Sequence, residues 1–193
     1  EQTPADLDTI VDLDKIPVLH CWPEDGGPFV TMTAVISKDP VRGIRNVGMY
    51  RVQQLDKKSV AMHWQRHKTG AEHMRQMAER GEKMPVCIVV GADPASMFSA
   101  SAPLPPNIDE FLFAGFLRRD PVKLTKAVSC DLEVPADAEF VIAGYIDPAE
   151  ALVHLRKRYE GRGVNLVRVG DAWAMRTAPD LGFLMQKEVV EAR

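Results

Sequence analysis

The run Met84–Val90 constrains the fold more than any other stretch of the sequence, because its residues are apolar throughout. Successive side chains of a strand point to opposite faces of a sheet. A continuous apolar run of this length, rich in β-branched residues, therefore predicts a strand that is buried on both faces. The rest of the chain must then provide a layer on each side of this strand.

Three runs with strand character precede this segment. Val30–Ser37 is rich in Thr and Val, Asn46–Gln54 alternates, and Val60–Gln65 forms a third run. Residues 39–43, with the sequence Asp-Pro-Val-Arg-Gly, have the composition of a turn. The spacing predicts an antiparallel meander of three strands with short connections.

Helical and strand patterns alternate in the middle of the chain. Asp93 and Pro94 suit the N-cap and first position of a short helix that ends at Ser99. The other expected elements are helices over Ala71–Arg80, closed by Gly81, and Ile108–Arg118, and strands over Val122–Val134 and Glu139–Tyr145. The pattern predicts a mixed α+β fold, dominated by an antiparallel sheet that can close as a barrel.

The pattern changes again near Asp147. Pro148–Tyr159 is expected to be helical, Val164–Val169 and Ala172–Arg176 to form a hairpin around Gly170-Asp171, and a last helix to begin at residues 178–180. We therefore expect two domains, residues 1–147 and residues 148–193.

Length and composition exclude several classes of protein. The 193 residues carry 24 Lys and Arg against 27 Asp and Glu, a net charge of −3, which argues against a dedicated nucleic-acid surface. The apolar runs are too short to cross a membrane, and no leader sequence opens the chain. The three cysteines, Cys21, Cys87 and Cys130, are isolated in the sequence, and we expect buried, unreactive thiols and a cytoplasmic setting.

The first candidate site lies in the second and third strand runs. On a strand, Asn46, Gly48 and Tyr50 share one face, and Val47, Met49 and Arg51 the other. Arg51 among apolar neighbours suits the binding of a phosphate or a carboxylate, but an arginine at a sheet edge can also extend its head group into water. His63, Trp64 and Gln65 follow on the next run, and each alone suits a structural role equally well.

Glu110 is a second candidate, at the start of the expected helix. Acidic residues in a first helical turn stabilise the helix dipole, which is one interpretation of Asp109 and Glu110. The other is a cation site, because an Asn oxygen and a Glu carboxylate are ligands that Mg²⁺ or Mn²⁺ prefers. The sequence has neither a Gly-x-Gly-x-x-Gly fingerprint nor a Walker A loop.

Residues from about 13 to 147 resemble the UbiD family of prenylated-flavin-dependent decarboxylases. The matching stretches, in order, are Cys21-Trp22-Pro23 with Gly26-Gly27, Asp39-Pro40, Arg45-Asn46-Val47-Gly48-Met49-Tyr50-Arg51, Met62-His63-Trp64-Gln65 with Gly70-Ala71, Gly91-Ala92-Asp93-Pro94, Glu110–Arg118 and Asp131-Leu132-Glu133-Val134-Pro135. The resemblance implies a split β-barrel related to flavin reductases. It also implies reversible decarboxylation of an aromatic or α,β-unsaturated acid, in which the flavin ring system accepts the electrons left by CO2.

The resemblance also implies roles for individual residues. Asn46 and Glu110 would hold a divalent cation, Mn²⁺ or Mg²⁺, at the phosphate of prenylated FMN or FMN, and potassium is a further implied cation. Arg51 would engage the substrate carboxylate as the catalytic residue. The implied cofactor-binding residues are Asn46, Met49, Tyr50, Arg51, His63, Trp64, Gln65, Lys68 and Thr69. A flavin prenyltransferase would supply the cofactor, and a homo-oligomer stays open.

Two features of the family are not found by sequence. These are an N-terminal α/β segment and an acidic motif that handles protons, so we expect a catalytically incomplete protein. The tail, with Gly161-Arg162-Gly163 and Trp173–Thr177, resembles part of the first winged-helix domain of the chromosome segregation protein ScpB. The alternative function is therefore a non-catalytic fusion or scaffold whose tail mediates protein interaction, and a recombinant without a selected function is a third interpretation.

Overall fold

The structure is a computed structural model that describes residues 12–148, 157, 160, 164–169 and 172–177. The chain divides into two compact units, Glu1–Ile146 and Asp147–Arg193, and each is described here by itself. A short 3-10 helix, η2 (Leu13–Lys15), opens the described part of the first unit.

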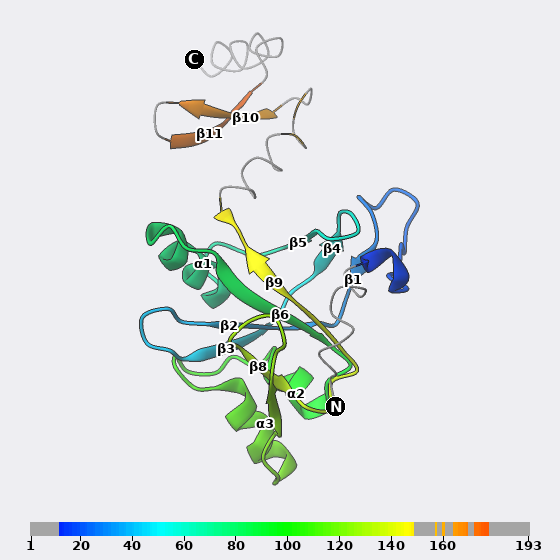
Figure 1. Cartoon of the computed structure of the whole chain (residues 1–193), viewed down its shortest axis with the longest axis vertical. Coiled ribbons are helices and arrows are strands. Elements are labelled where there is room, and N and C mark those ends of the chain that lie inside the picture. Colours follow the sequence, from blue (N-terminus) through cyan, green and yellow to red (C-terminus); the bar gives the residue numbers. More distant parts are fainter. Residues whose placement is uncertain (1–11, 149–156, 158–159, 161–163, 170–171, 178–193) are drawn as a thin grey trace, which may run out of the picture. The chain divides into compact units, whose positions relative to one another are not determined.

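A four-stranded antiparallel sheet lies at the centre of the first unit (Figure 1). Its strands, in spatial order, are β3 (Arg45–Met49), β2 (Ala34–Lys38), β6 (Met84–Val90) and β9 (Phe140–Ile146). Ile36 on β2 is opposite both Val47 on β3 and Cys87 on β6, which fixes the register of the sheet. The predicted apolar run is therefore an inner strand, with the bounds that the sequence indicates.

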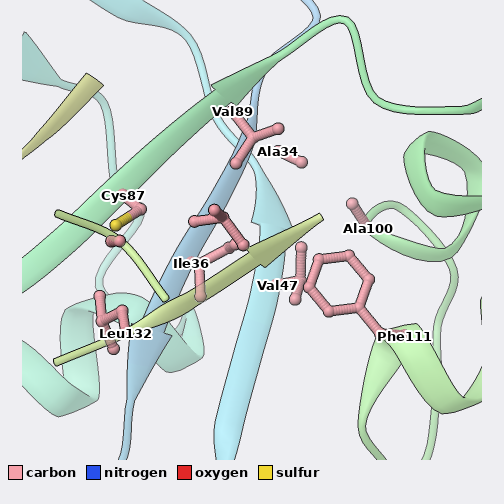
Figure 2. Close-up of a cluster of buried hydrophobic side chains, with 10 residues drawn as sticks. Ala34, Ile36, Val47, Cys87, Val89, Ala100, Phe111 and Leu132 are labelled. Carbon is pink, nitrogen blue, oxygen red and sulfur yellow. The ribbon is translucent and has the colours of Figure 1, made fainter. Parts of the chain in front are cut away.

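Alternate residues of β6 enter two different groups of core side chains. Cys87 and Val89 belong to the group on one face, which includes Phe111 and Leu132 (Figure 2). Val86 and Ile88 belong to the other group, with Val35 and Val52. The prediction of a strand buried on both faces is confirmed.

Helices and a short hairpin cover the first face. The elements are α2 (Pro94–Ser99), α3 (Glu110–Arg118), β7 (Leu124–Lys126) and β8 (Glu133–Pro135). As the sequence predicts, Asp93 caps α2 by accepting from the N–H groups of Ala95 and Ser96, and Pro94 occupies its first turn. α3 begins two residues later than expected, because the side chain of Asp109 accepts from the N–H of Phe111 and acts as the N-cap.

The second face is covered by a three-stranded antiparallel sheet and by α1 (Thr69–Glu79), which lies on the opposite side of the central sheet from α2 and α3 (Figure 1). The strands of the smaller sheet, in spatial order, are β1 (Phe29–Val30), β4 (Val52–Gln54) and β5 (Val60–Met62). α1 ends before Gly81, whose φ of +69° suits a glycine after a helix. The α+β class and the antiparallel pairing are confirmed.

The expected meander and closed barrel are corrected in three places. Asn46–Gln54 is not one strand, because the chain leaves β3 at Tyr50-Arg51 and enters the other sheet as β4. Val30–Ser37 is interrupted at Met32, which has a left-handed φ of 57°. Val122–Val134 forms two short paired strands, β7 and β8. Within the described residues, β3 and β9 remain edges of one sheet and β1 and β5 edges of the other, so the sheets do not close.

In the second unit, β10 (Val164–Val169) and β11 (Ala172–Thr177) pair as an antiparallel hairpin, with Val169 opposite Ala172. The predicted hairpin is confirmed. The helices predicted on either side of it, and with them the winged-helix fragment, lie largely outside the described residues. No helix of the described part has the length and apolar character needed to cross a membrane.

Candidate functional site

A cavity of about 750 Å³ lies beside β3, an edge strand of the central sheet. Its walls come from β3, from the N-terminal ends of α1 and α3, and from the proline-rich segment 102–106. This volume falls within the range of small-molecule and cofactor sites, which is about 300–1,000 Å³. Six of the predicted site residues line the cavity: Asn46, Met49, Tyr50, Lys68, Thr69 and Glu110.

Asn46 and Glu110 bring an amide and a carboxylate to the same cavity from segments far apart in the sequence. The Asn46 Nδ2 atom is buried and has no hydrogen-bond partner among the described residues. One carboxylate oxygen of Glu110 accepts from the Val47 N–H at 2.9 Å. Burial raises the pKa of Glu110, against the opposing effects of this hydrogen bond and of the Arg45 charge.

Arg45 links β3 to the start of α3 and so positions Glu110. Its Nε and Nη2 atoms donate to Asp109 at 3.1 and 2.6 Å, and its Nη1 atom donates to Glu133 at 3.1 Å. The guanidinium also lies 5.1 Å from the centroid of the Phe111 ring. Asp109 therefore both caps α3 and pairs with β3, which fixes the helix end against the strand.

Tyr50 folds back over Gly48, and a Cβ atom added at Gly48 would lie only 2.5 Å from the tyrosine ring. The Tyr50 ring meets Trp64 edge to face, with centroids 5.8 Å apart, and Trp64 in turn lies against Gly70. Burial raises the pKa of Tyr50, although the Asn46 amide and the Gly70 N–H act to lower it. The ring pair thus fills the space between β3 and the start of α1, where the two glycines leave room for it.

The N-terminus of α1 is suited to an anion. Lys68 is the N-cap residue, but its side chain makes no capping hydrogen bond, so the first N–H groups of the helix are not capped by it. Lys68 and Thr69 both line the cavity. Free N–H groups, the helix dipole and a nearby ammonium group together favour a phosphate at this position.

The other predicted site residues lie outside the cavity wall. Arg51 is half-exposed, its guanidinium stacks 3.6 Å from the centroid of Phe29, and its Nη2 atom is 3.7 Å from Asp25 Oδ2. That Asp25 oxygen is buried and makes no hydrogen bond within the described residues. His63 and Gln65 are exposed, whereas Trp64 reaches the site through its contact with Tyr50. The structure therefore separates Arg51 from Asn46 and Glu110.

The sequence-based prediction missed two histidines on the cavity wall, His67 and His73. His73 is buried, and its Nδ1 atom lies 3.0 Å from the Ser37 hydroxyl. Burial lowers the pKa of His73, against the nearby charges of Asp39 and Glu72. Its spacing to Ser37 carries no local signal, because the two residues meet only when α1 packs on β2.

The residues present fit a hard cation next to a phosphate. In the described part of the chain, no group of three or more His, Cys, Asp or Glu side chains is placed to hold a metal by itself. Asn46 and Glu110 would supply two oxygen ligands, and a cation such as Mg²⁺ commonly completes its shell with phosphate and water. The unpartnered amide of Asn46 is consistent with a group missing from this position.

Comparison with protein families identifies the chain. Residues 2–170 match UbiD, described as the 3-octaprenyl-4-hydroxybenzoate carboxy-lyase Rift-related domain. The chain belongs to the UbiD family. The match extends past residue 147 into the second unit, and the ScpB resemblance of the tail is not supported by the comparisons.

Two relatives cover most of the first unit. An uncharacterized protein of Aquifex aeolicus (strain VF5) is 51% identical over 143 residues, which are 74% of this chain and 29% of the relative. An uncharacterized protein of Archaeoglobus fulgidus is 53% identical over 135 residues, 69% of this chain and 28% of the relative. The chain thus spans less than a third of the length of these UbiD relatives.

Solved structures have a similar fold. The 3,4-dihydroxybenzoic acid decarboxylase of Klebsiella pneumoniae superposes with a TM-score of 0.66 at 28% identity, over 75% of this chain and 30% of that enzyme. A dimeric form of HmfF from Pelotomaculum thermopropionicum, in complex with prenylated FMN, gives 0.62 at 25% identity, over 78% and 34%. Vanillic acid decarboxylase of Sedimentibacter hydroxybenzoicus gives 0.66 at 25% identity, over 83% and 33%.

Proposed function

We propose that this chain is the flavin-binding domain of a UbiD-type decarboxylase or carboxylase, which binds prenylated FMN or FMN and acts on aromatic or α,β-unsaturated carboxylic acids. The observation that carries the proposal is the cavity beside β3, where Asn46, Glu110 and the N-terminus of α1 face the same space. HmfF is known in complexes with prenylated FMN and with FMN, and two other structural neighbours are decarboxylases of aromatic acids.

The phosphate end of the cofactor is assigned to this cavity. Asn46 and Glu110 would bind Mn²⁺ or Mg²⁺, and the N–H groups at the start of α1, with Lys68 and Thr69, would bind the phosphate oxygens. The buried setting of Glu110 supports this role, because a nearby cation would favour the ionised carboxylate that burial alone disfavours. Potassium belongs to the proposal as a further cation.

The ring end is assigned to the residues around Tyr50 and Trp64. Met49 lines the cavity, and the edge-to-face ring pair makes an apolar wall next to it. His63 and Gln65 flank Trp64 in the sequence and would contact the same part of the cofactor. When bound, the flavin would supply the ring system that accepts the electron pair of the breaking C–C bond.

Arg51 is assigned to the substrate carboxylate. Its guanidinium is held by the face of Phe29 and by the charge of Asp25, and it remains half-exposed. A planar guanidinium can give a carboxylate two parallel hydrogen bonds, which would orient the bond to be broken. Because the chain spans only part of its relatives, the activity of the complete protein is part of the proposal.

Flavin content tests the proposal directly. The chain is co-expressed with a flavin prenyltransferase, the enzyme proposed to supply the cofactor, with manganese and potassium present, and the purified protein is analysed by absorption and mass spectrometry. We expect bound prenylated FMN, and bound FMN when the prenyltransferase is omitted. A folded protein that is colourless after both treatments, and that takes up no FMN in a titration, would contradict the proposal.

Replacing Arg51 with Ala should weaken the binding of an aromatic acid to the flavin-loaded protein by about tenfold or more, because hydrogen bonds to charged groups contribute roughly 1.5–3 kcal/mol. Calorimetry with a dihydroxybenzoate measures this change. Arg80→Ala, at the far end of α1, is the matched control and should leave the affinity unchanged. Equal affinity of the Arg51→Ala variant and the parent, with the same flavin content, would reject the assignment.

A further inference from the structure

Two free thiols meet where the centre of the core sheet contacts the β7–β8 connection. Cys87 and Cys130 are 43 positions apart in the sequence, and their Sγ atoms lie 3.5 Å from each other. Cys87 is fully buried on β6 among the core side chains of Figure 2, whereas Cys130 is partly exposed. The expectation that both are isolated thiols is wrong, because the fold places them in contact.

The surroundings of the two sulfurs make them chemically unequal. The Cys87 thiol can donate to the Cys130 sulfur, and this contact lowers the pKa of Cys130 to about 7, with a further contribution from the Leu132 N–H. The same contact, together with burial, raises the pKa of Cys87. Near neutral pH the pair therefore carries one shared proton, with the thiolate on the more accessible sulfur.

The segment that carries Cys130 is held in place but remains at the surface. The Ala127 N–H donates to the Leu132 carbonyl at 2.8 Å, and the Tyr145 hydroxyl donates to the Ser129 carbonyl at 3.0 Å. The neighbouring residues Val128, Ser129 and Asp131 are exposed. A peroxide can thus reach Cys130, while Cys87 waits behind it.

We propose that Cys87 and Cys130 form a two-thiol oxidation site, which a peroxide converts into an intramolecular disulfide that joins β6 to the β7–β8 connection. The two sulfurs need to approach by about 1.5 Å to reach the length of a disulfide bond. A small shift of the Ala127–Leu132 segment supplies this movement, since Cys87 is fixed between β2 and β9. The inference does not depend on flavin binding.

The oxidation proceeds in two balanced steps. The Cys130 thiolate attacks one oxygen of hydrogen peroxide, the O–O bond breaks, and a sulfenic acid and hydroxide form. The Cys87 sulfur then attacks the sulfenic sulfur, the S–O bond breaks, and the departing hydroxide takes the Cys87 proton to leave as water. In total, two thiols lose two electrons and two protons, and one peroxide becomes two waters.

The disulfide would close a loop that contains α2, the proline-rich segment and α3. This loop includes Glu110 and one wall of the cavity. A covalent link over so many residues restricts the unfolded chain, so the oxidised protein should melt at a higher temperature than the reduced protein. The link is reversible, because a dithiol reductant can regenerate both thiols.

The test uses the full chain, hydrogen peroxide and three variants. Stoichiometric peroxide should remove two of the three free thiols of the parent and of Cys21→Ser, and peptide mapping should find Cys87 linked to Cys130. Cys130→Ser and Cys87→Ala should form no intramolecular disulfide. The Cys87→Ala variant should instead accumulate a sulfenic acid at Cys130, which dimedone traps. Dithiothreitol should restore the thiols and the lower melting temperature of the parent.

Two results would overturn the inference. In the first, peroxide oxidises the exposed Cys21 while Cys87 and Cys130 of the folded parent remain reduced. In the second, the only disulfides found join Cys21 of two chains. If Cys87→Ala does not fold, the conservative Cys130→Ser variant and the parent still decide the question, because the linked peptide is either present or absent.

Discussion

Replacing Glu110 with Gln should lower the amount of flavin that the protein retains by at least about 100-fold, since even residues that only support a metal ligand change metal affinity by about 10–100-fold. The amide keeps the shape of the side chain and can still accept the Val47 N–H, but it loses the negative charge that would attract a divalent cation. Flavin absorbance per protein after dialysis measures the effect. Removal of the metal with EDTA should release flavin from the parent and have little further effect on the variant.

The same substitution should have the opposite effect on stability. The pKa of Glu110 is raised in the folded protein, so above its unfolded value the folded state keeps a proton that the unfolded state releases. This lowers the stability of the flavin-free parent as the pH rises through the folded pKa, and Glu110→Gln removes the loss. Thermal melts at pH 4 and pH 7.5 should show the variant gaining on the parent as the pH rises.

A surface variant provides the control for both measurements. Glu79→Gln makes the same chemical change at the exposed end of α1, and it should alter neither flavin retention nor the pH dependence of melting. If Glu110→Gln retains as much flavin as Glu79→Gln, the carboxylate has no part in holding the cofactor. The stability measurement then shows whether Glu110 serves only to cap and brace the start of α3.

Truncation of Ile36 to Ala should destabilise the first unit by about 2–5 kcal/mol, out of a total that is typically about 5–15 kcal/mol. Ile36 is fully buried at the centre of the sheet, opposite Val47 on one side and Cys87 on the other (Figure 2). Strands on both sides hold the backbone, so the cavity left by the smaller side chain cannot collapse easily. Urea unfolding followed by circular dichroism measures the loss.

Hydrogen exchange then locates the effect within the chain, which divides into two compact units. Peptides from β2 and β6 should lose protection in Ile36→Ala, whereas those from β10 and β11 should not change. Val41→Ala, in an exposed turn, is the control and should shift stability by less than about 0.5 kcal/mol. A cost as small for Ile36→Ala would mean that the central sheet is not the stabilising core.

Local signals predicted the parts of the fold that depend on neighbouring residues. Met84–Val90 is apolar on both of its faces, and the structure buries both. Asp93 and Pro94 are one of the strongest helix starts in the sequence, and α2 begins where they indicate. In such segments the propensity, the pattern and the tertiary packing agree, so the sequence alone is informative.

Other parts depend on contacts that no local pattern contains. The alternation from Asn46 to Gln54 continues without Gly or Pro at the point where β3 ends and β4 begins, so it gives no sign that the run is shared by two sheets. Arg45 meets its partners Asp109 and Glu133 across 64 and 88 positions of the sequence. The proximity of Cys87 and Cys130 is equally non-local.

The candidate site was reached mainly through the family resemblance. Composition and spacing left Glu110 equally suited to a helix cap and to a cation site, and they left Arg51 equally suited to solvent. The structure adds that Asn46 and Glu110 face one cavity, and that Arg51 lies apart from it with Phe29 and Asp25. The individual cofactor assignments remain predictions for the flavin and variant experiments.

The passage of the chain from β3 to β4 at Tyr50-Arg51 has a consequence for how such a domain can diversify. Residues before this point take their register from β2, whereas Arg51 and its neighbours take theirs from β1 and β5. Substitutions in the smaller sheet can therefore retune what Arg51 recognises while Asn46 keeps its place. A protein engineer could exploit this modularity by grafting the smaller sheet of one relative onto the central sheet of another.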